Sequence, residues 1–410
     1  MGLFRKTGQW LSMMGRVFRN EWKLVLGDMG VLLFFVALPL AYPVAYTLVY
    51  NPEVVDNIRI AVVDNSRTKE SRELVRTVDA TPALEVYDYA SDLGEAKKMM
   101  AETKVYGVLE IPADYARKLG RGEQVHVPFY ADMSLLLRFR SEMGALTDVQ
   151  IQMGKEIMPV TIDETPLSAL AAGRELSLPV KSDSYFLGDT EQGFASFVIP
   201  GIIILILQQS LVLGVCLIGG TSRERRRRDP QGLDPKAVNE AGPWATIWGK
   251  TLCYTVFYIP FVLYLTRIVP EMFSLPHYGS PVQYLLFLLP LLLSSSFLGL
   301  TLVYFMKERE SAFIIVVFTS VIFLFLSGLT WPRYAMSRFW VWMSDIVPAT
   351  WGIEGFISIN NNGATLAEES TDYIALWILS AVYMFTAAWV CRKIAVSSRL
   401  RALSKKESGE

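Results

Sequence analysis

The sequence predicts an α-helical polytopic membrane protein with six transmembrane helices and an inserted extracytoplasmic α/β domain. Three observations lead to this fold class. Of the 410 residues, 52% are hydrophobic and only 19% are charged, with a mean hydropathy of +0.31, whereas soluble domains carry about 25% charged residues. Six stretches are long and apolar enough to cross a bilayer. A polar block, residues 51–190, separates the first stretch from the other five.

Runs without Asp, Glu, Lys or Arg locate the spans, because a spanning helix needs about 20 predominantly apolar residues. The six predicted spans lie near residues 31–50, 195–219, 247–267, 283–306, 311–329 and 373–391. The first run is too long for a cleaved signal peptide, and no small-residue cleavage site follows it.

These runs divide the chain into an ordered series of segments. We expect an amphipathic interface helix at 1–28, a transmembrane helix at 29–50, an extracytoplasmic α/β domain with a helical stalk at 51–190, transmembrane helices two to six at 191–392, and a cytoplasmic tail at 393–410. Within the transmembrane region, a cytoplasmic coupling loop is predicted at 220–246 and a re-entrant segment at 330–365.

Lys and Arg residues near the spans set the orientation, because cytoplasmic flanks carry an excess of them. The leader, the segment between spans two and three, the turn between spans four and five, and the tail are all basic, and all four lie on one side if there are six spans. The opposite side has only Arg267, Arg333 and Arg338 in its short loops. Both termini are therefore predicted to be cytoplasmic, with residues 51–190 outside.

The outside block carries 16 Lys and Arg and 23 Asp and Glu, a net charge of −7. Strand-like and helix-like patterns alternate along its first half, which is typical of a small α/β domain. The expected strands are 58–63, 84–87, 105–111 and 125–131. The expected helices are 68–78, 91–102 with Ser91 as its cap, and 134–170, which Pro159 and Pro166 should break or kink. Asp64, Asp88 and Asp132 end strands, either as a shared polar site or as turn and cap residues.

The leader, Leu3–Asp28, has an apolar face and a basic face when placed on a helical wheel. This pattern predicts a helix lying in the membrane interface. The apolar face holds Met13, Met14, Val17, Phe18, Trp22, Leu24 and Val25, and the basic face holds Arg16, Arg19 and Lys23. Glu21 falls on the apolar face, where it pairs with a cytoplasmic arginine or a partner protein, or sits at a frayed position.

The sequence offers no pattern typical of a metal site, a disulfide framework or a nucleotide site. The three cysteines lie in apolar stretches with no metal-site or disulfide spacing. Gly249-Lys250-Thr251 ends like a phosphate-binding loop, but Trp244 stands where the first glycine would be. We therefore expect no cofactor and no nucleotide site in this chain. Its net charge of −1 offers no attraction to nucleic acid.

Three local stretches resemble those of a known family. They are Asn20-Glu21-Trp22 with Gly27-Asp28 and Pro39; Ser222-Arg223-Glu224-Arg225 with Gly249-Lys250 and Tyr254; and Phe325–Gly328 with Trp331-Pro332 and Pro348-Ala349-Thr350. With its layout of spans, the chain resembles the permease of ABC type-2 exporters, in the subgroup with a large extracytoplasmic domain after the first span. It departs from the family pattern at Arg226–Arg228, which replace a Gly-Thr pair, and at Cys253, which replaces a proline.

The resemblance implies a permease subunit, not itself an enzyme, of an ATP-driven exporter that moves a hydrophobic or amphipathic substrate (drug, lipid or glycolipid-like) out across the bacterial inner membrane. It implies a cytoplasmic ABC ATPase subunit, a second permease copy or paralogue, membrane lipids and a periplasmic adaptor as partners. ATPase coupling is implied for Glu21, Arg223, Glu224, Arg225, Arg226 and Lys250, and an external gate for Trp331, Pro332, Trp340, Pro348 and Trp351.

Other interpretations of these residues stay open. Gln208 and Gln209 in span two face a pathway or hydrogen-bond neighbouring helices. Arg225–Arg228 bind anionic lipid or dock a partner, and the tryptophans form a plain aromatic belt or a gate. The main alternative function is a membrane-anchored receptor or scaffold whose outside domain binds a ligand or protein. An intramembrane enzyme is disfavoured, because the predicted spans contain no carboxylate pair or Ser/His arrangement.

Overall fold

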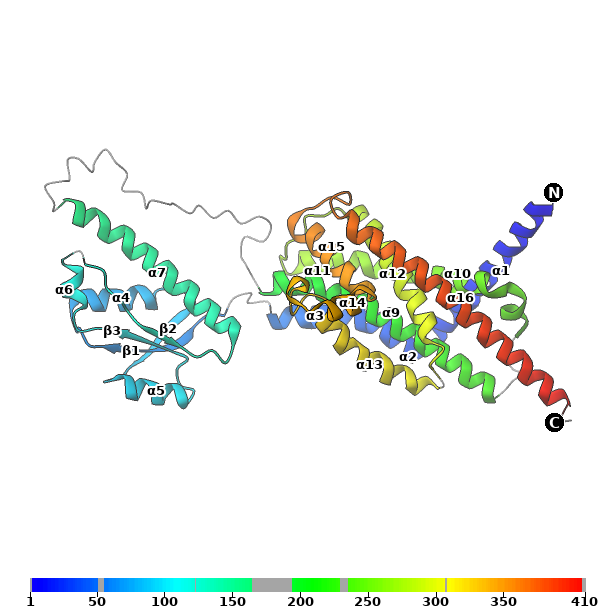
Figure 1. The fold of residues 1–410 in the computed structure, drawn as a ribbon, viewed down its shortest axis with the longest axis horizontal. Helices are drawn as coiled ribbons and strands as arrows, with labels where there is room; N and C mark the ends of the chain where they lie inside the picture. The colour runs from blue at the N-terminus through cyan, green and yellow to red at the C-terminus, as the bar shows by residue number, and fades with distance from the viewer. Residues whose placement is uncertain are drawn as a thin grey trace. The chain divides into compact units, whose positions relative to one another are not determined.

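The computed structural model of the chain describes residues 2–50, 55–121, 123–163, 194–228, 235–306 and 308–407. It divides into two compact units. Residues Met1–Asn51 and Phe186–Glu410 form one unit, here called the membrane unit, and Pro52–Tyr185 form the other, here called the α/β domain. Both are drawn in Figure 1.

Among its described residues, the membrane unit contains six helical segments that are long and apolar enough to cross a membrane. They are Met29–Tyr50, Phe194–Glu224, Gly242–Met272, Pro281–Leu302, Arg309–Leu326 and Ser370–Val396, numbered spans 1 to 6 below. The prediction of a polytopic helical protein with six transmembrane helices and an inserted domain is confirmed. The third span is longer than expected, because it begins five residues earlier and ends five residues later than predicted.

Spans 1 and 3 are each interrupted by one π-helical turn. Span 1 consists of α2 (Met29–Leu32), the π-helical turn η1 (Leu33–Ala37) and α3 (Leu38–Tyr50). Span 3 begins at Gly242 within α10 (Pro235–Leu263) and continues through the π-helical turn η2 (Tyr264–Ile268) and α11 (Val269–Met272). The other spans lie in α9 (Phe194–Arg228), α12 (Pro281–Leu302), α13 (Arg309–Leu326) and α16 (Ser370–Glu407).

Helix α9 is the centre of the membrane unit. In the most apolar window of span 2, 94% of residues are buried inside the protein, against 17% for span 5. A helix that is apolar all round belongs in an interior. Gly214 lets span 1 approach α9 closely, since a Cβ there would lie 1.7 Å from Phe35 Cε1. Small residues allow such contacts between transmembrane helices.

The leader forms α1 (Gly2–Gly27), which ends one residue before the predicted boundary at residue 28. Val17 and Val25 on its apolar face are buried, and α1 packs mainly against α10. Helix α10 itself bends at Gly242, whose φ of +72° is accessible chiefly to glycine. Helix α1 and the C-terminal end of α16 lie at the same end of the membrane unit, here called the N/C end (Figure 1).

Two short helices follow span 5, within the segment predicted to be re-entrant. They are α14 (Arg338–Asp345) and α15 (Pro348–Asn362), preceded by the 3-10 turn η3 (Arg333–Ala335). Neither is long enough to cross a bilayer. Helix α15 packs against α9, α16 and α12, so it belongs to the interior of the bundle. It ends at Gly363, which adopts the left-handed conformation typical of a helix C-terminus.

The α/β domain has a four-stranded sheet in the order β2-β1-β3-β4. Its strands are β1 (Ile58–Asp64), β2 (Leu84–Tyr89), β3 (Gly107–Ile111) and β4 (Phe129–Ala131), and its helices are α4 (Lys69–Asp79), α5 (Leu93–Ala101), α6 (Tyr115–Leu119) and α7 (Leu136–Asp163). Only β4 is antiparallel. Helices α4, α6 and α7 contribute to the core on one face of the sheet, and α5 covers the other face.

Some local predictions for this domain were wrong. Strands β3 and β4 start later than expected, at Gly107 and Phe129. Asp92, not Ser91, caps α5, because its carboxylate accepts the Glu95 N–H at 2.8 Å. Helix α7 continues past Pro159 to Asp163, whereas the second predicted helix breaker in the stalk, residue 166, lies outside the described residues.

The three aspartates at strand ends serve as turn and cap residues. Asp64 accepts hydrogen bonds from the Ser66 and Arg67 amides and the Ser71 hydroxyl. Asp88 accepts the Tyr89 amide. Asp132 binds Ser134 and Arg138 instead. Among the described residues, no group of three or more His, Cys, Asp or Glu side chains is arranged to hold a metal ion.

Glu142 is a buried carboxyl group of this domain. Its side chain is fully buried, and in the described part of the chain neither carboxylate oxygen has a hydrogen-bond partner. Arg138 Nε lies 3.9 Å from Glu142 Oε1, and the Arg138 guanidinium is committed to Asp132 and to the Tyr106 ring, 4.0 Å away. Burial raises the pKa of Glu142 to about 7, Arg138 lowers it in part, and Asp132 raises it further.

We predict that this carboxyl makes the domain less stable as the pH rises. The folded state binds the Glu142 proton more tightly than the unfolded state does. The contribution of this proton to the free energy of unfolding is therefore complete below the unfolded pKa and is lost as the pH rises through the folded pKa of about 7. The free energy of unfolding of the domain should fall by on the order of 3 kcal/mol between pH 4 and pH 8. Hydrogen exchange of the β1 and β3 amides in the full-length protein should show it, and Glu142→Gln should remove it. A pH-independent exchange rate after correction for intrinsic chemistry would contradict this assignment.

Candidate coupling site and candidate gate

The apolar face of α1 carries its acidic residue to a buried partner on α10. Glu21 is only 3% exposed. The Lys250 ammonium donates to both of its carboxylate oxygens, with Nζ 2.8 Å from Oε1 and 2.7 Å from Oε2. The Tyr254 hydroxyl also donates to Oε1. The predicted coupling residues Glu21 and Lys250 are therefore in direct contact, and Glu21 pairs with a lysine where an arginine was considered.

This three-residue contact fixes α1 to the third span. A buried carboxylate costs free energy unless it is paired and hydrogen-bonded, and here both conditions are met. Sequence reasoning did not select Tyr254 as a site residue. The sequence feature that could have identified Tyr254 is its position four residues after Lys250, which places both side chains on one face of α10.

A second ion pair joins the start of span 1 to the start of span 5. Arg309 donates to both oxygens of Asp28, with Nη2–Oδ1 at 2.7 Å and Nη1–Oδ2 at 3.0 Å. Asp28 also caps α2, because its Oδ1 accepts the Gly30 and Val31 amides. Burial alone would raise the pKa of Asp28, but these hydrogen bonds and the Arg309 charge hold it below its usual range. A Cβ at position 30 would lie 2.0 Å from Arg309 Nη2, so a side chain there would displace the Arg309 guanidinium.

Arg223 connects the end of α9 to the end of α12. Its Nη1 donates to the carbonyls of Val303, Tyr304 and Met306 at 2.9, 2.8 and 2.7 Å. The carbonyls at a helix C-terminus lack intrahelical partners and carry partial negative charge, so a guanidinium is well suited to them. Arg223, predicted to serve ATPase coupling, thus binds within the chain. Glu224 follows it in α9, and the side chains of Arg225 and Arg226 lie outside the described residues.

The candidate gate is organised by Arg333, a residue that the sequence did not single out. Its guanidinium pairs with Asp345 at the end of α14 and with Glu354 in α15. It also stacks over the Trp351 ring, with Cζ 4.5 Å from the ring centre. The Trp351 indole N–H donates to the Asp345 carbonyl at 2.9 Å. One cation thus holds η3, α14 and α15 together.

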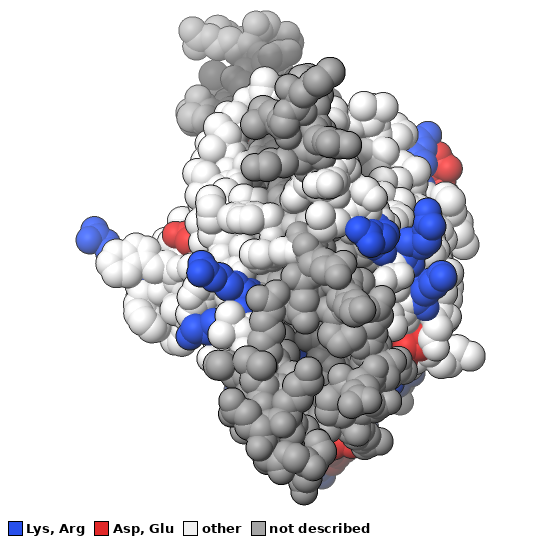
Figure 2. All heavy atoms as spheres, turned by 90° about the vertical axis from the view of Figure 1, so that its right-hand side faces the viewer, with Lys and Arg blue, Asp and Glu red and all other residues white. Residues whose placement is uncertain are grey.

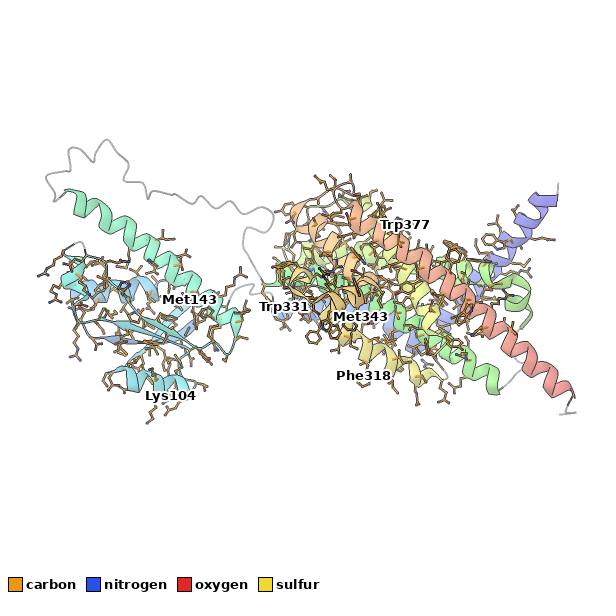
Figure 3. All side chains as sticks on the ribbon, viewed as in Figure 1. Lys104, Met143, Phe318, Trp331, Met343 and Trp377 are labelled. Carbon is orange, nitrogen blue, oxygen red and sulfur yellow. The ribbon has the colours of Figure 1, made fainter. Side chains whose placement is uncertain are left out.

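The aromatic residues predicted for the gate fall into two groups. Trp351 is half-buried within the Arg333 cluster, whereas Trp331 and Trp340 are exposed; Figure 3 labels Trp331. Pro332 precedes η3, and Pro348 is buried in the first turn of α15. Proline suits that position because the first turn of a helix has no use for its missing amide donor. The structure brings Trp351 and Pro348 to α15 and leaves the other two tryptophans on the surface.

Gln208 hydrogen-bonds across helices. It is 1% exposed, and its Oε1 accepts the Ala349 amide at 2.6 Å. This bond satisfies one of the orphan amides at the start of α15. Within the described part of the chain, Gln208 Nε2 and both side-chain polar atoms of Gln209 are buried without a hydrogen-bond partner.

The far end of α15 is held by two buried asparagines. The Asn360 amide donates to the Pro276 carbonyl at 2.8 Å, and its Oδ1 accepts the Tyr284 hydroxyl at 3.0 Å. Asn361 donates to the Ser196 carbonyl at 3.1 Å. Helix α15 is therefore fixed at both ends, to α9 and to the helices around it. The sequence signal that was missed is three asparagines and a glycine at residues 360–363, beside apolar spans.

Comparison with models of protein families identifies the family to which the chain is similar. A family model described as ABC-2 family transporter protein matches residues 29–389, which is most of the 410-residue chain. No curated protein matches the chain.

We predict that Glu21→Gln detaches α1 from α10. The substitution leaves the Lys250 ammonium without its counter-charge, and breaking a buried pair in this way costs about 3 kcal/mol. Trypsin should therefore cleave after Arg16 and Arg19 at least about tenfold faster in the detergent-purified variant. Glu310→Gln removes an exposed carboxylate at the N/C end and is the matched control. The double variant Glu21→Leu, Lys250→Met should recover part of the protection; equal cleavage of the wild type and Glu21→Gln would rule out the anchoring role.

We predict that Arg333→Lys loosens α14 and α15. A lysine presents a single ammonium and cannot pair with Asp345 and Glu354 while stacking flat on Trp351. The loss should amount to about 1–3 kcal/mol of local stability and appear as faster hydrogen exchange across residues 338–362. Arg338→Lys changes an exposed arginine of α14 and should leave the exchange unaltered. Identical exchange in both variants would show that the Arg333 contacts add nothing.

Proposed function

The chain belongs to the ABC-2 transporter family, and on this premise we propose that it is the permease subunit of an ATP-driven exporter. The observation that carries the proposal is the buried contact of Glu21 with Lys250 and Tyr254. It ties an amphipathic helix outside the spans to a helix within them. A force applied to α1 therefore reaches span 3 directly, which is what a permease driven by a separate ATPase requires.

The ATPase docks at the N/C end in this proposal. It contacts helix α1, which packs against α10, and the segment of α10 before Gly242. Asp28–Arg309 connects span 1 to span 5, and Arg223 connects span 2 to span 4. Closure of the ATPase on bound ATP moves α1 and the α10 segment, and the ion pairs pass this motion to the spans. Glu224, Arg225 and Arg226, which follow Arg223 in the sequence, are further contacts with the ATPase in this proposal.

The N/C end faces the cytoplasm in this proposal. Figure 2 shows this face of the molecule, where Lys and Arg side chains outnumber Asp and Glu among the residues drawn in colour. An excess of basic residues is typical of the cytoplasmic side. The α/β domain is then extracytoplasmic, in the periplasm of a two-membrane bacterium, where it passes cargo to a periplasmic adaptor. The membrane is the bacterial inner membrane.

The cargo is hydrophobic or amphipathic in this proposal, and two permeases form its path. Charged residues within the six spans are few, so the interior suits an apolar or amphipathic molecule. Span 5 is the least buried span, and its outer side is strongly apolar; Phe318, labelled in Figure 3, is 72% exposed. In the membrane this surface contacts lipid or a second permease, identical or paralogous.

Helix α15, held by Gln208 and Arg333, serves as the external gate.

Purification tests the proposal. The tagged protein, extracted from its native host in mild detergent, should retain a stoichiometric ATPase subunit and show vanadate-sensitive ATP hydrolysis. Glu21→Gln should keep the ATPase bound but reduce cargo-dependent hydrolysis by about tenfold or more, because the connection from α1 to span 3 is broken. Replacement of Arg225–Arg228 by alanine should instead reduce the amount of ATPase retained. Glu310→Gln is the control for both.

An ATPase-free preparation that is folded would contradict the proposal. It would favour a membrane-anchored receptor or scaffold, in which the spans serve only as an anchor. Unchanged cargo-dependent ATP hydrolysis in Glu21→Gln would not affect the assignment to the family. It would refute the proposal that motion passes from α1 to span 3 through Glu21.

A further inference from the structure

The first turn of α15 covers a group of buried polar side chains near the middle of span 2. Gln208 Oε1 accepts the Ala349 amide at 2.6 Å, which leaves Nε2 as the free end of the Gln208 side chain. In the described part of the chain, Gln208 Nε2, Thr350 Oγ1 and Ser295 Oγ are buried without a hydrogen-bond partner. Gln208 is almost completely buried, and Thr350 and Ser295 are completely so. These three side chains are here called the polar junction.

The polar junction lies where three helices meet at one level. A Cβ on Gly352 of α15 would lie 3.0 Å from Ile204 Cγ2 of α9 and 3.0 Å from Leu291 Cδ1 of α12. About one helical turn leads from Ile204 to Gln208 and from Leu291 to Ser295. Spans 2 and 4 cross in the same direction, since span 3 lies between them in the chain. Gln208 and Ser295 are therefore level with the first turn of α15.

The serines beside Ser295 show what its hydroxyl lacks. Ser294 Oγ donates to the Leu291 carbonyl at 3.0 Å, and Ser296 Oγ donates to the Leu292 carbonyl at 2.7 Å. Such bonds to the preceding turn are how serine hydroxyls are met within a helix. All three serines are completely buried, and of the three, Ser295 alone is without a partner in the described residues.

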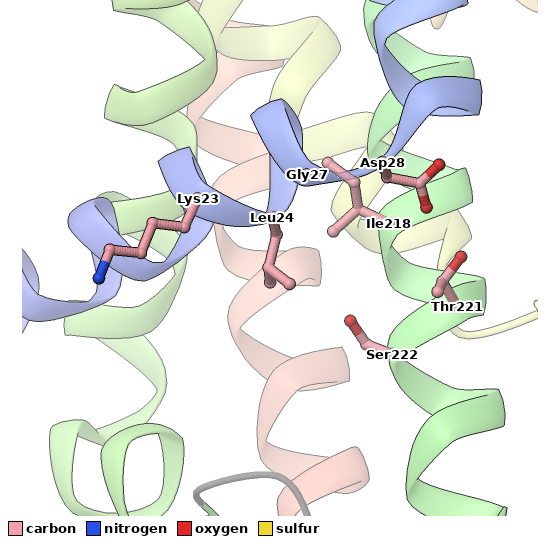
Figure 4. Close-up of a pocket in the computed structure, with 7 residues that line it drawn as sticks. All are labelled: Lys23, Leu24, Gly27, Asp28, Ile218, Thr221 and Ser222. Carbon is pink, nitrogen blue, oxygen red and sulfur yellow. The ribbon is translucent and has the colours of Figure 1, made fainter.

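Another buried hydroxyl has a different setting. Thr221 Oγ1 is also without a partner among the described residues, but Thr221 lines a cavity of about 160 Å³ between the ends of α1 and α9 (Figure 4). A water molecule needs only about 10–15 Å³, so water can reach Thr221 without any movement of the helices. At the polar junction the close contacts of Gly352 show that α15 is packed directly on its neighbours.

These unmet hydrogen bonds work against the closed position of α15. Buried polar groups are nearly always satisfied, and each one that is left without a partner costs free energy. The polar junction contains no charged side chain, so water is sufficient to satisfy it. Moving the first turn of α15 away from α9 and α12 would admit that water.

We propose that α15 is a gate poised to open, because its closed position leaves the polar junction without partners and its outward movement lets water satisfy them. The Ala349–Gln208 hydrogen bond and the Arg333 contacts hold α15 closed against this bias. The inference rests on the proposed function in taking α15 as the external gate, and it adds that the ATPase has to supply only the difference between these opposing contributions.

Hydrogen exchange of residues 352–362 in the full-length, detergent-purified protein tests the gate. Thr350→Val keeps the shape of the side chain but removes the hydroxyl, and Ser295→Ala removes a hydroxyl from α12. Each should slow exchange in α15 by about tenfold, because closure no longer buries an unpartnered polar group. Ser296→Ala removes an equally buried hydroxyl that is bonded to its own helix, and Thr221→Val removes one beside a cavity. Neither control should slow the exchange.

Unchanged or faster exchange in Thr350→Val and Ser295→Ala would overturn the proposal, since it would show that these hydroxyls are satisfied while α15 is closed. Equal slowing in Ser296→Ala would also overturn it, because the effect would then come from any apolar replacement in this part of the bundle.

Thiol labelling measures the opening itself. In Thr350→Cys, a water-soluble maleimide should react only when α15 moves away, and adding Ser295→Ala should slow this reaction by about tenfold. Adding Ser296→Ala should not slow it, and equal rates in the two double variants would contradict the proposal. Peptide mapping separates the new thiol from the native cysteines, Cys216, Cys253 and Cys391.

Both measurements use the permease alone, without an ATPase or a cargo. The purification described under the proposed function does not depend on the polar junction. The poised gate and the transporter assignment can therefore fail separately.

Discussion

A charged side chain in an apolar interior must find an opposite charge, and this constraint organises the membrane unit. Removing a charge from water costs several kcal/mol unless a partner and hydrogen bonds replace the lost hydration. Two of the pairs that meet this requirement join elements far apart in the sequence, and those of Arg333 join neighbouring segments. Glu21 reaches Lys250, Asp28 reaches Arg309, and Arg333 reaches both Asp345 and Glu354. Each pair fixes one helical segment to another, while the apolar surfaces between them set how closely the helices pack.

Helix α9 connects the two polar clusters. One end carries Arg223, bound to the end of α12; its middle carries Gln208, bound to the start of α15; and the Ser196 carbonyl near its other end accepts Asn361. The candidate coupling site and the candidate gate therefore share one buried helix. A displacement of α9 along its axis changes contacts at both places, whereas a displacement of the exposed α13 changes mainly those at Arg309 and with α9. This arrangement explains why the most buried helix also carries polar residues that its apolar surroundings penalise.

The sequence predicted the six spans, the amphipathic leader and the α/β character of the inserted domain, because hydrophobic periodicity is a local property. It also marked Glu21 as exceptional, since a carboxylate on an apolar face has to be explained. It did not predict the partners of Arg309, Arg333 or Asn360, which are set by how distant helices pack. The cap at Asp92 was missed by one residue, as is common at helix ends. Periodicity shows which face of a helix is buried, but not what lies opposite.

The π-helical turns lie where two of the spans depart from regular α-helix. Such turns widen a helix by one residue and are often found at functional sites. Spans 1 and 3 each contain one, and Phe35 within η1 packs against Tyr254 and Tyr258 of α10. Tyr254 holds Glu21, and Tyr258 donates to Ser210 of α9 at 3.0 Å. The Phe35 ring thus lies between the anchor of α1 and the central helix. Since Gly214 leaves it no spare room, movement of α10 at Glu21 must shift Phe35 against α9, and this steric contact adds to the polar ones in carrying motion across the bundle.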